Sequence, residues 1–498
     1  MTAADSGQMF VLLPAEGLRG NTSIPEHRSF LMQARPRVLA FAGEGSLDWE
    51  EELREVSVVD SLGESGAKLL RLDPGSVGAL RAYQPGLRLV PVTYFTEAVA
   101  ARPTLRASAK MAKSAKPGFT LSVKVVSAAD GKPLARTEIE AFVNVAAGEG
   151  ARAITDKRGV AELRFSSHPK KLERLYVYPR SGHWGLLRRR VDTTASLSVS
   201  LTPVDLGYQD CLRHFYKTGA DGSNVRIGIV DSGIALDHPD LHIEGGLNAV
   251  TGEDPSDYGD NGTIGHGTHV AGIAAACGSP PTGARGIAPA AILRSYRVYG
   301  KRKRRAESFS IAKAILQATD DKCDIISLSL TGQPDVTVEE AIEDAWKHGT
   351  LVIAAAGNDG RKPVSFPART DFAIAVSALG RKGTFPVDAV ESGDIAKPWG
   401  HDDSNFIGSF SNVGPEIDLT APGVAIISTL PGGYGVMTGT SMACPAACGL
   451  AARLLSQNTK IFKQKRDIAR ATALAKLLLQ SARTLGFEAS FQGRGLPA

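Results

Sequence analysis

The sequence predicts an α/β protein whose C-terminal part, residues 204–498, is built on a doubly wound parallel sheet. Apolar runs at 225–230, 325–330 and 350–356 have the length and composition of buried parallel strands. Segments with helical spacing occur between and after them, at 308–320 and 338–348. Such alternation of buried strands and helices is typical of a doubly wound sheet.

Two smaller domains are expected before this sheet, with a leader at 1–36. Residues 37–95 alternate strand and helix patterns, which predicts a small α/β domain. Residues 118–203 hold short alternating strands between turns, which is typical of a small antiparallel β-sandwich. Residues 96–117 are polar and alanine-rich, so we expect a flexible linker there. The expected elements of the first domain are strands at 38–41, 68–72 and 87–92 and helices at 47–56 and 75–83. Those of the sandwich are strands at 121–125, 138–145, 160–165, 175–178 and 197–201.

Composition restricts the partners that we expect. Hydrophobic residues make up 43% of the chain, charged residues 22%, and the net charge is +5, which argues against nucleic acid and membranes as main partners. The N-terminus has neither a basic region nor a long apolar segment, so we expect no secretory signal. The five cysteines are scattered and show no metal-binding spacing, which favours a reducing, cytoplasmic location.

Three residues in separate stretches suggest nucleophilic catalysis. Ser441 precedes an apolar run with helical spacing, where it is either a helix N-cap or a nucleophile at a helix N-terminus. Asp231 ends the apolar run at 225–230, and His266 opens an apolar helix. An aspartate, a histidine and a serine can serve as orienter, general base and nucleophile.

The motifs around these residues resemble those of the subtilisin-like serine endopeptidases, the subtilases. The matches are Ile-Val-Asp-Ser-Gly at Asp231, His-Gly-Thr-His-Val-Ala-Gly from His266, and Gly-Thr-Ser-Met-Ala at Ser441. A fourth, Ala-Ala-Ala-Gly-Asn-Asp-Gly, places the family's oxyanion-hole asparagine at Asn358. The resemblance covers residues 205–498 and implies an Asp-His-Ser triad acting through an acyl-enzyme.

The resemblance also implies a substrate-binding edge, to which the substrate backbone adds as a strand. The residues are Ser329, Leu330, Thr331 and Gly332. Thr331 stands where the family commonly has glycine, so we expect a reshaped first specificity pocket. Asp359 falls at the rim of that pocket, either as a charge that attracts basic side chains or as a turn residue. His269 competes with His266 as general base, but the motif favours His266 and predicts a packed, hydrogen-bonded His269.

The two N-terminal domains show weaker resemblances. Residues 37–95 resemble the propeptide inhibitor domain of subtilases, whose tail, here 93–95, would lie in the active-site cleft. An unrelated small α/β domain is the alternative. Residues 118–203 resemble carboxypeptidase-regulatory-like modules and carry no catalytic set, so we expect a structural or docking role.

The sequence gives little support for a cofactor. Asp240 matches a carboxylate that binds calcium in many subtilases. The loop at 277–285, expected to complete that site, offers no side-chain carboxylate or amide. Because calcium needs six to eight oxygen ligands, we expect no metal there.

A basic run, Lys301-Arg302-Lys303-Arg304-Arg305, lies just before the helix expected at 308–320. In subtilases this connection forms one wall of the substrate cleft. The run is either a solvated loop or a surface that recruits acidic substrates.

The resulting prediction is a serine endopeptidase made as an autoinhibited precursor, acting on proteins or peptides and inhibited by its own N-terminal domain. Two alternatives stay open: a catalytically silent scaffold with the subtilase fold, and a targeting protein that acts through its β-sandwich.

Overall fold

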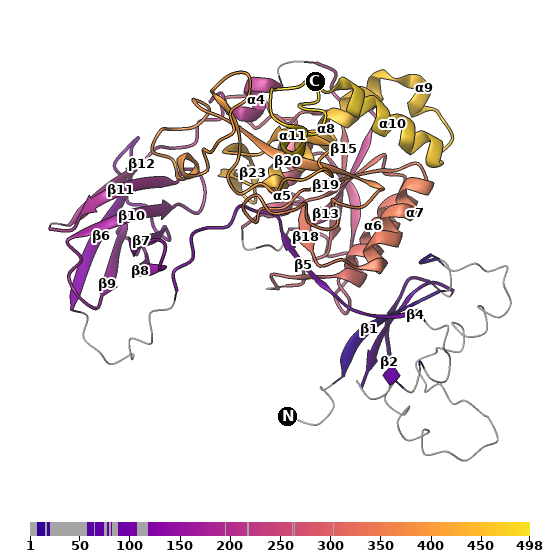
Figure 1. Cartoon of the computed structure of the whole chain (residues 1–498), viewed down its shortest axis with the longest axis horizontal. Coiled ribbons are helices and arrows are strands. Elements are labelled where there is room, and N and C mark those ends of the chain that lie inside the picture. The colour runs from indigo at the N-terminus through magenta and orange to yellow at the C-terminus, as the bar shows by residue number, and fades with distance from the viewer. Residues whose placement is uncertain are drawn as a thin grey trace, which may run out of the picture.

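The computed structural model (Figure 1) describes residues 7–14, 17–19, 57–63, 65–73, 77–78, 81, 88–106, 118–194, 196–216, 219–260, 262, 264–301 and 303–498. The strand expected at 38–41 and the helix expected at 47–56 lie outside these residues, as do 107–117 of the expected linker. No helix among the described residues is both long and apolar enough to cross a membrane.

An eight-stranded sheet forms the centre of the C-terminal part, which confirms the α/β class. Its strand order is β14-β15-β13-β17-β19-β20-β21, with β22 beside β20. All pairs are parallel except β20 with β21. The strands are β13 (Arg226–Asp231), β14 (Ile243–Asn248), β15 (Ile292–Arg297), β17 (Ile325–Leu328), β19 (Leu351–Ala355), β20 (Ala373–Arg381), β21 (Asn405–Ile407) and β22 (Leu419–Pro422).

Helices cover both faces of this sheet. Buried residues of α5, α8 and α10 share one apolar cluster, and those of α6 and α7 share another. The longer helices are α5 (His266–Ala275), α6 (Ser308–Asp320), α7 (Val336–Lys347), α8 (Thr440–Gln457) and α10 (Ile468–Ser481). The helix expected at 308–320 is therefore confirmed. Short elements complete this part: α4 (Cys211–Phe215), 3₁₀ helix η2 (Val390–Gly393), β23 (Ile426–Leu430), β24 (Gly433–Met437), α9 (Thr459–Phe462) and α11 (Ala489–Gln492).

The strand expected at 325–330 is divided in two. The central strand β17 ends at Leu328, and β18 (Leu330–Gly332) then pairs outside the central sheet. The break falls at Ser329, whose backbone and side chain bond to Ser441 of α8 instead.

Residues 118–203 form two sheets around one core. The first has the order β11-β10-β7-β8 and the second β12-β6-β9. Leu121, Ile139 and Leu163, from both sheets, lie in a single buried cluster. The expectation of a wholly antiparallel sandwich is wrong for one pair, since β12 runs parallel to β6. The strands are β6 (Phe119–Ser127), β7 (Glu138–Asn144), β8 (Glu149–Ile154), β9 (Val160–Phe165), β10 (Lys171–Tyr178), β11 (Leu186–Asp192) and β12 (Leu197–Leu201).

An antiparallel sheet of the order β2-β3-β1-β4 forms the N-terminal part. Its strands are β1 (Gln8–Leu13), β2 (Ser57–Ser61), β3 (Lys68–Leu72) and β4 (Arg88–Pro91). Residues 8–13 were expected in the leader, but β1 pairs with both β3 and β4, so the boundary expected at residue 37 is wrong.

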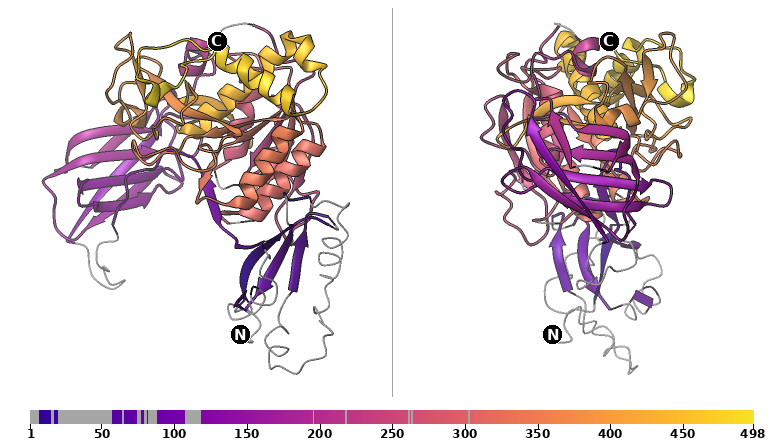
Figure 2. Two further views of the ribbon diagram at one scale, coloured as in Figure 1. Left: turned by 45° about the vertical axis from the view of Figure 1, so that its right-hand side comes forward. Right: turned by 90° about the vertical axis from the view of Figure 1, so that its left-hand side faces the viewer.

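The N-terminal sheet packs on helices α6 and α7. Val11 and Leu69 lie in the same buried cluster as Ile315 and Ala341 of these helices. Ion pairs surround this contact, from Arg19 to Asp320 and Asp344 and from Lys313 to Asp60, at 2.9–3.1 Å. Figure 2 shows this sheet and the β-sandwich on different sides of the C-terminal part.

Between these two parts the chain passes through the C-terminal domain. Strand β5 (Tyr94–Glu97) lies between β16 (Ala306–Glu307) and β18 and pairs antiparallel with both. The linker expected from residue 96 therefore begins too early, because residues 96 and 97 belong to a paired strand.

Candidate active site

Asp231 and His266 meet at the carboxyl end of β13, between its neighbours β15 and β17, where open α/β sheets place their sites. His266 Nδ1 donates to Asp231 Oδ1 at 2.7 Å, and both side chains are buried. His266 is the first residue of α5. A side chain at Gly267 would lie 2.1 Å from the Gly233 carbonyl, so glycine is required for the helix to start this close to the strand.

Ser441 lies in the first turn of α8, and its environment depends on Pro445. Because Pro445 has no N–H, the Ser441 carbonyl cannot make the usual helical bond, and Ser329 Oγ donates to it at 2.9 Å. Ser441 Oγ in turn donates to the Ser329 carbonyl at 3.0 Å. Among the described residues, His266 Nε2 has no hydrogen-bond partner.

Asn358 is oriented by the same helix. Its Oδ1 accepts from the Thr440 N–H at 2.9 Å, and Gly357 N–H donates to Thr440 Oγ1 at 3.1 Å. The side-chain Nδ2 of Asn358 is buried and has no partner within the described part of the chain. A fixed amide with a free N–H is suited to stabilising a negative oxygen.

His269 is buried one turn further along α5, and its bonds lead away from Asp231. Its Nε2 lies 3.1 Å from the Ile426 carbonyl and 3.3 Å from that of Gly435. Burial, together with the charge of His266, lowers the pKa of His269 to about 3, so this ring is neutral. The prediction of a packed, hydrogen-bonded His269 is confirmed.

Strand β5 and the residue after it, Ala98, occupy the edge at Ser329–Gly332. The register pairs Leu330 with Glu97, Thr331 with Thr96, and Gly332 with Phe95. Ala98 N–H donates to the Ser329 carbonyl at 3.1 Å, and Ala100 N–H donates to the Thr438 carbonyl at 2.9 Å. All four residues predicted for the substrate edge thus contact a polypeptide strand.

One further bond relates this segment to Ser441. The Ser441 backbone N–H donates to the Ala98 carbonyl at 3.1 Å. The carbonyl of the Ala98–Val99 peptide bond therefore lies at the nucleophile candidate. The cleft-binding tail expected from the sequence ended at residue 95. Ala98 and Ala100 also lie in the cleft, and their small side chains were the signal for this. The signal was missed because the surrounding alanine-rich sequence is typical of a linker.

Phe95 fills an apolar pocket in this cleft. It is fully buried, its ring centroid lies 5.8 Å from that of Phe366, and Leu330 belongs to the same cluster. The side chain three residues before Ala98 is thus held by packing alone.

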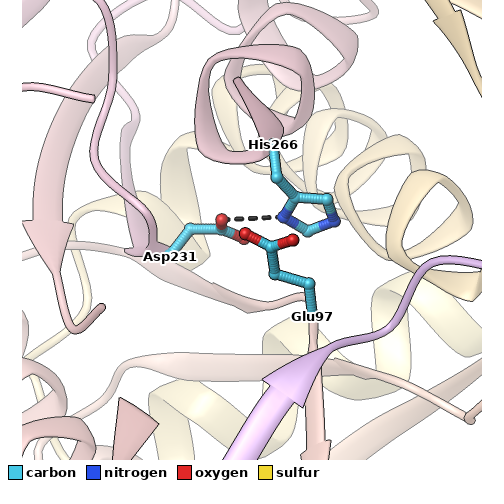
Figure 3. A group of neighbouring side chains, drawn as sticks. All are labelled: Glu97, Asp231 and His266. Carbon is cyan, nitrogen blue, oxygen red and sulfur yellow. Dashed lines mark hydrogen bonds and ion pairs between the residues drawn. The ribbon is translucent and has the colours of Figure 1, made fainter. Parts of the chain in front are cut away.

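Glu97 lies against the pair of Asp231 and His266 (Figure 3). One ligand-type atom from each of these three residues lies within 4.8 Å of the others. Burial lowers the pKa of His266, but the charges of Asp231 and Glu97 and the hydrogen bond that His266 donates to Asp231 outweigh it and raise the pKa to about 9. Burial raises the pKa of Glu97, although the His266 charge acts in the opposite direction. The spacing of these three side chains would suit a cation. However, His266 and Asp231 already share a proton in the Nδ1–H bond, which is the simpler arrangement.

The basic run lies on the other side of β5 from Ser329–Gly332. Ala306 pairs with Phe95 and Glu307 with Tyr94, and continuing this register places Arg304 opposite Glu97. Arg304 lowers the pKa of Glu97, which agrees with that placement. Lys303 and Arg304 are exposed. Lys301 pairs with Asp257 at 2.9 Å.

The Asp240 carboxylate does not fit a calcium site. Its Oδ2 accepts from the Ala284 N–H at 2.7 Å and from the Tyr434 hydroxyl at 2.8 Å. These donors satisfy Oδ2, and the loop at 277–285 offers no side-chain carboxylate or amide toward the six to eight oxygens that calcium needs. The Asp359 carboxylate is likewise engaged locally, since it accepts from Asn412 Nδ2 at 2.8 Å.

Calcium removal is therefore expected to have little effect. Adding excess EGTA should change neither the thermal midpoint nor the rate of peptide cleavage, because Asp240 already has protein donors. Thermal unfolding and peptide hydrolysis with and without chelator would check this. A chelator-induced fall in the midpoint that added calcium reverses would contradict it.

Comparisons with known proteins give the family of the C-terminal part. Residues 222–495 match the subtilase family, Peptidase_S8. The chain is 39% identical over 245 residues to subtilisin BL of Lederbergia lenta, which covers 49% of this chain and 80% of the relative. It is 35% identical over 284 residues to subtilisin DY of Bacillus licheniformis, covering 56% and 90% respectively. It is 38% identical over 245 residues to subtilisin Savinase of Lederbergia lenta, covering 49% and 80%.

Proposed function

The chain belongs to the subtilase family and is a subtilisin-like serine endopeptidase, and we propose that Asp231, His266 and Ser441 form its catalytic triad. Ser441 Oγ attacks the substrate carbonyl and passes its proton to the free Nε2 of His266. Asp231 holds the Nδ1 proton and stabilises the imidazolium that forms. The acyl-enzyme is then hydrolysed by water through the same groups.

The observation that carries this proposal is the position of the Ala98 carbonyl. It accepts from the Ser441 N–H while the Ala98 N–H bonds to Ser329. A carbonyl held this way is positioned for attack, and its oxygen would become the oxyanion. We assign the Ser441 N–H and Asn358 Nδ2 as the two oxyanion donors.

The N-terminal part is proposed to make this protein an autoinhibited precursor. Its sheet packs on α6 and α7, and β5 fills the cleft up to the Ala98–Val99 bond. A strand that pairs on both sides excludes other substrates. We therefore propose that the enzyme cuts its own Ala98–Val99 bond and that residues before it act as the inhibitor.

The experiment is N-terminal sequencing and intact-mass measurement of the purified protein, together with labelling by a fluorophosphonate probe. We expect a new N-terminus at Val99 and labelling of the C-terminal fragment, both absent in Ser441→Ala. A new N-terminus elsewhere would refute the assigned bond. Labelling that persists in Ser441→Ala would refute the assigned nucleophile.

Glu97 should slow the first cut at neutral pH. With a pKa of about 9, His266 is protonated at pH 7 and cannot accept the Ser441 proton, so processing should rise with pH up to about 9 and then level off. In Glu97→Gln one of the carboxylates that raise this pKa is lost, whereas Asp231 and Asp260 remain. In this variant the processing rate should therefore begin to rise at a lower pH than in the wild type. Each unit by which the pKa of His266 falls enlarges the fraction of neutral His266 at pH 7 about tenfold.

Processing rates of freshly refolded protein between pH 6 and 10 would test this effect. Thr96→Val is the matched control, since Thr96 is exposed on the same strand. It should keep the wild-type profile. Identical midpoints for wild type and Glu97→Gln would exclude a role for Glu97.

Substrates in trans are proposed to be proteins or peptides, and acidic residues next to the basic run are proposed to strengthen their binding rather than to speed their cleavage. The support is the charge of the exposed Arg304, which lowers the pKa of Glu97. Exposed charges of this kind raise the local concentration of oppositely charged segments.

A further inference from the structure

The chain leaves the active site across the β-sandwich. After Ala100, whose N–H bonds to Thr438, residues 101–106 continue to the sheet β11-β10-β7-β8 (Figure 1). On the proposed function, which this inference requires, Val99 is the first residue after the cut. Arg102 and Leu105 are then the fourth and the seventh.

Arg102 has a recognition site on two adjacent strands. Its guanidinium lies 3.9 Å from the centroid of the Tyr178 ring, and its Nη1 donates to Glu138 Oε2 at 2.8 Å. Tyr178 on β10 and Glu138 on β7 face each other directly in the strand register. The Tyr178 ring is itself stacked on Tyr176, with parallel planes and centroids 5.9 Å apart. An aromatic face beside a carboxylate is a well-suited binding site for a guanidinium.

Leu105 and Arg106 make the next contacts. Leu105 packs against a small cluster formed by Phe142, Tyr176 and Leu187 on the same sheet. The Arg106 N–H donates to the Gly148 carbonyl at 2.9 Å. Gly148 has a φ of +67°, and a side chain there would lie 2.9 Å from the Thr104 carbonyl, so the turn between β7 and β8 is shaped for close approach of a strand.

The sandwich is fixed relative to the catalytic residues. The Leu187 N–H donates to the Asp388 carbonyl at 2.7 Å, and the Gly182 N–H donates to the Tyr434 carbonyl at 3.0 Å. Trp184 is buried in the main core of the C-terminal part. A polypeptide that binds both surfaces therefore meets them at a defined spacing.

We propose that this sheet of the sandwich extends the substrate cleft on the leaving-group side. It would bind an extended polypeptide with a basic residue, best arginine, at the fourth position after the cut and an apolar residue at the seventh. Residues 99–106 of the chain occupy this surface in the precursor as the first substrate does. Selection of substrates would then depend on two surfaces, the protease cleft and the sheet.

The test compares three quenched fluorescent peptides: residues 94–106, the same peptide with alanine in place of Arg102, and residues 94–101. The enzyme is the full-length chain after it has cut itself at Ala98–Val99. It carries Arg102→Ala and Leu105→Ala, which keep its own residues 99–106 from competing with the peptides. We expect kcat/KM for the arginine peptide to exceed that for the alanine peptide about tenfold, as a cation–π contact and an ion pair together allow. When Tyr178→Ala is added, the kcat/KM values for the arginine and alanine peptides should become equal.

Glu138→Gln should lower the ratio, while Glu162→Gln should leave it unchanged. Glu162 is an exposed carboxylate on β9, in the other sheet of the sandwich. Equal kcat/KM for the arginine and alanine peptides, with the short peptide still cleaved, would overturn the proposed surface. So would a ratio that survives Tyr178→Ala.

A binding measurement separates this inference from the proposed function. Fluorescein-labelled peptide 99–106 is titrated with protein carrying Ser441→Ala, Arg102→Ala and Leu105→Ala. Anisotropy should report salt-sensitive binding that weakens several-fold with Tyr178→Ala. If no variant cleaves any peptide, the proposed function fails, and this titration alone decides whether the surface exists. Binding that is indifferent to Tyr178→Ala would refute it.

Discussion

Replacing Ser441 by alanine is expected to leave the chain at full length and to lower kcat for peptides by about 10⁶-fold, the effect known for the serine of subtilisin. Without the hydroxyl, only substrate binding and the oxyanion donors remain. The structure allows a clean test. Among the described residues, the Ser441 hydroxyl bonds only to the Ser329 carbonyl, which also accepts from Ala98 N–H, so its removal leaves that carbonyl with a partner.

The measurements are intact mass, peptide hydrolysis and thermal unfolding of Ser441→Ala. We expect the thermal midpoint of the uncleaved variant to change no more than it would for a surface substitution. Loss of activity would then not be due to loss of the fold. Ser377→Ala is the matched control, because it also removes a buried hydroxyl, one that donates to Phe491. That variant should still process itself. Full-length wild type with undiminished peptidase activity would contradict the precursor proposal.

The second large effect is expected at Asn358. Replacing it by aspartate should lower kcat about 10²–10³-fold, as loss of one oxyanion donor does. The aspartate keeps the oxygen that accepts from the Thr440 N–H and loses the amide N–H. The helix start is therefore preserved, while a negative group faces the developing negative charge.

Steady-state kinetics distinguish this role from a structural one. An interaction made only in the transition state changes kcat and leaves KM nearly unaltered. Asn358→Ala should give a similar fall in kcat, with an additional loss of stability because the Thr440 N–H then lacks its acceptor. A fall in kcat/KM that comes from KM alone would contradict the assignment.

The parts of the fold that could be predicted depend on local patterns. Asp231 follows an uninterrupted apolar run and His266 opens an apolar helix, so strand, helix and their meeting point follow from periodicity and sheet geometry. The distance between His266 and Asp231 does not follow from either pattern. It depends on the close contact at Gly267, which only the folded chain shows.

The parts that were missed depend on pairing between distant residues. Strand β1 is six residues long and pairs with strands that follow it by more than fifty positions, so nothing local marks it as the partner of β3. Strand β5 has an alanine-rich continuation typical of a linker. It is extended because β16 and β18 supply backbone partners on both sides. The contacts of Arg102 with Tyr178 and Glu138 have the same origin.

The passage of one continuous strand through the cleft has a consequence for how the enzyme would respond to dilution. Before the cut, both halves of the bound segment are tethered, so their effective concentration at the cleft does not depend on the amount of protein. After a cut at Ala98–Val99, residues up to Ala98 become a separate molecule, whose occupancy falls with concentration by mass action. Residues from Val99 onward stay covalently attached to the sandwich. On dilution, the residues up to Ala98 would then leave the acyl side of the cleft first. On the leaving-group side, the attached residues from Val99 onward would still compete with substrates.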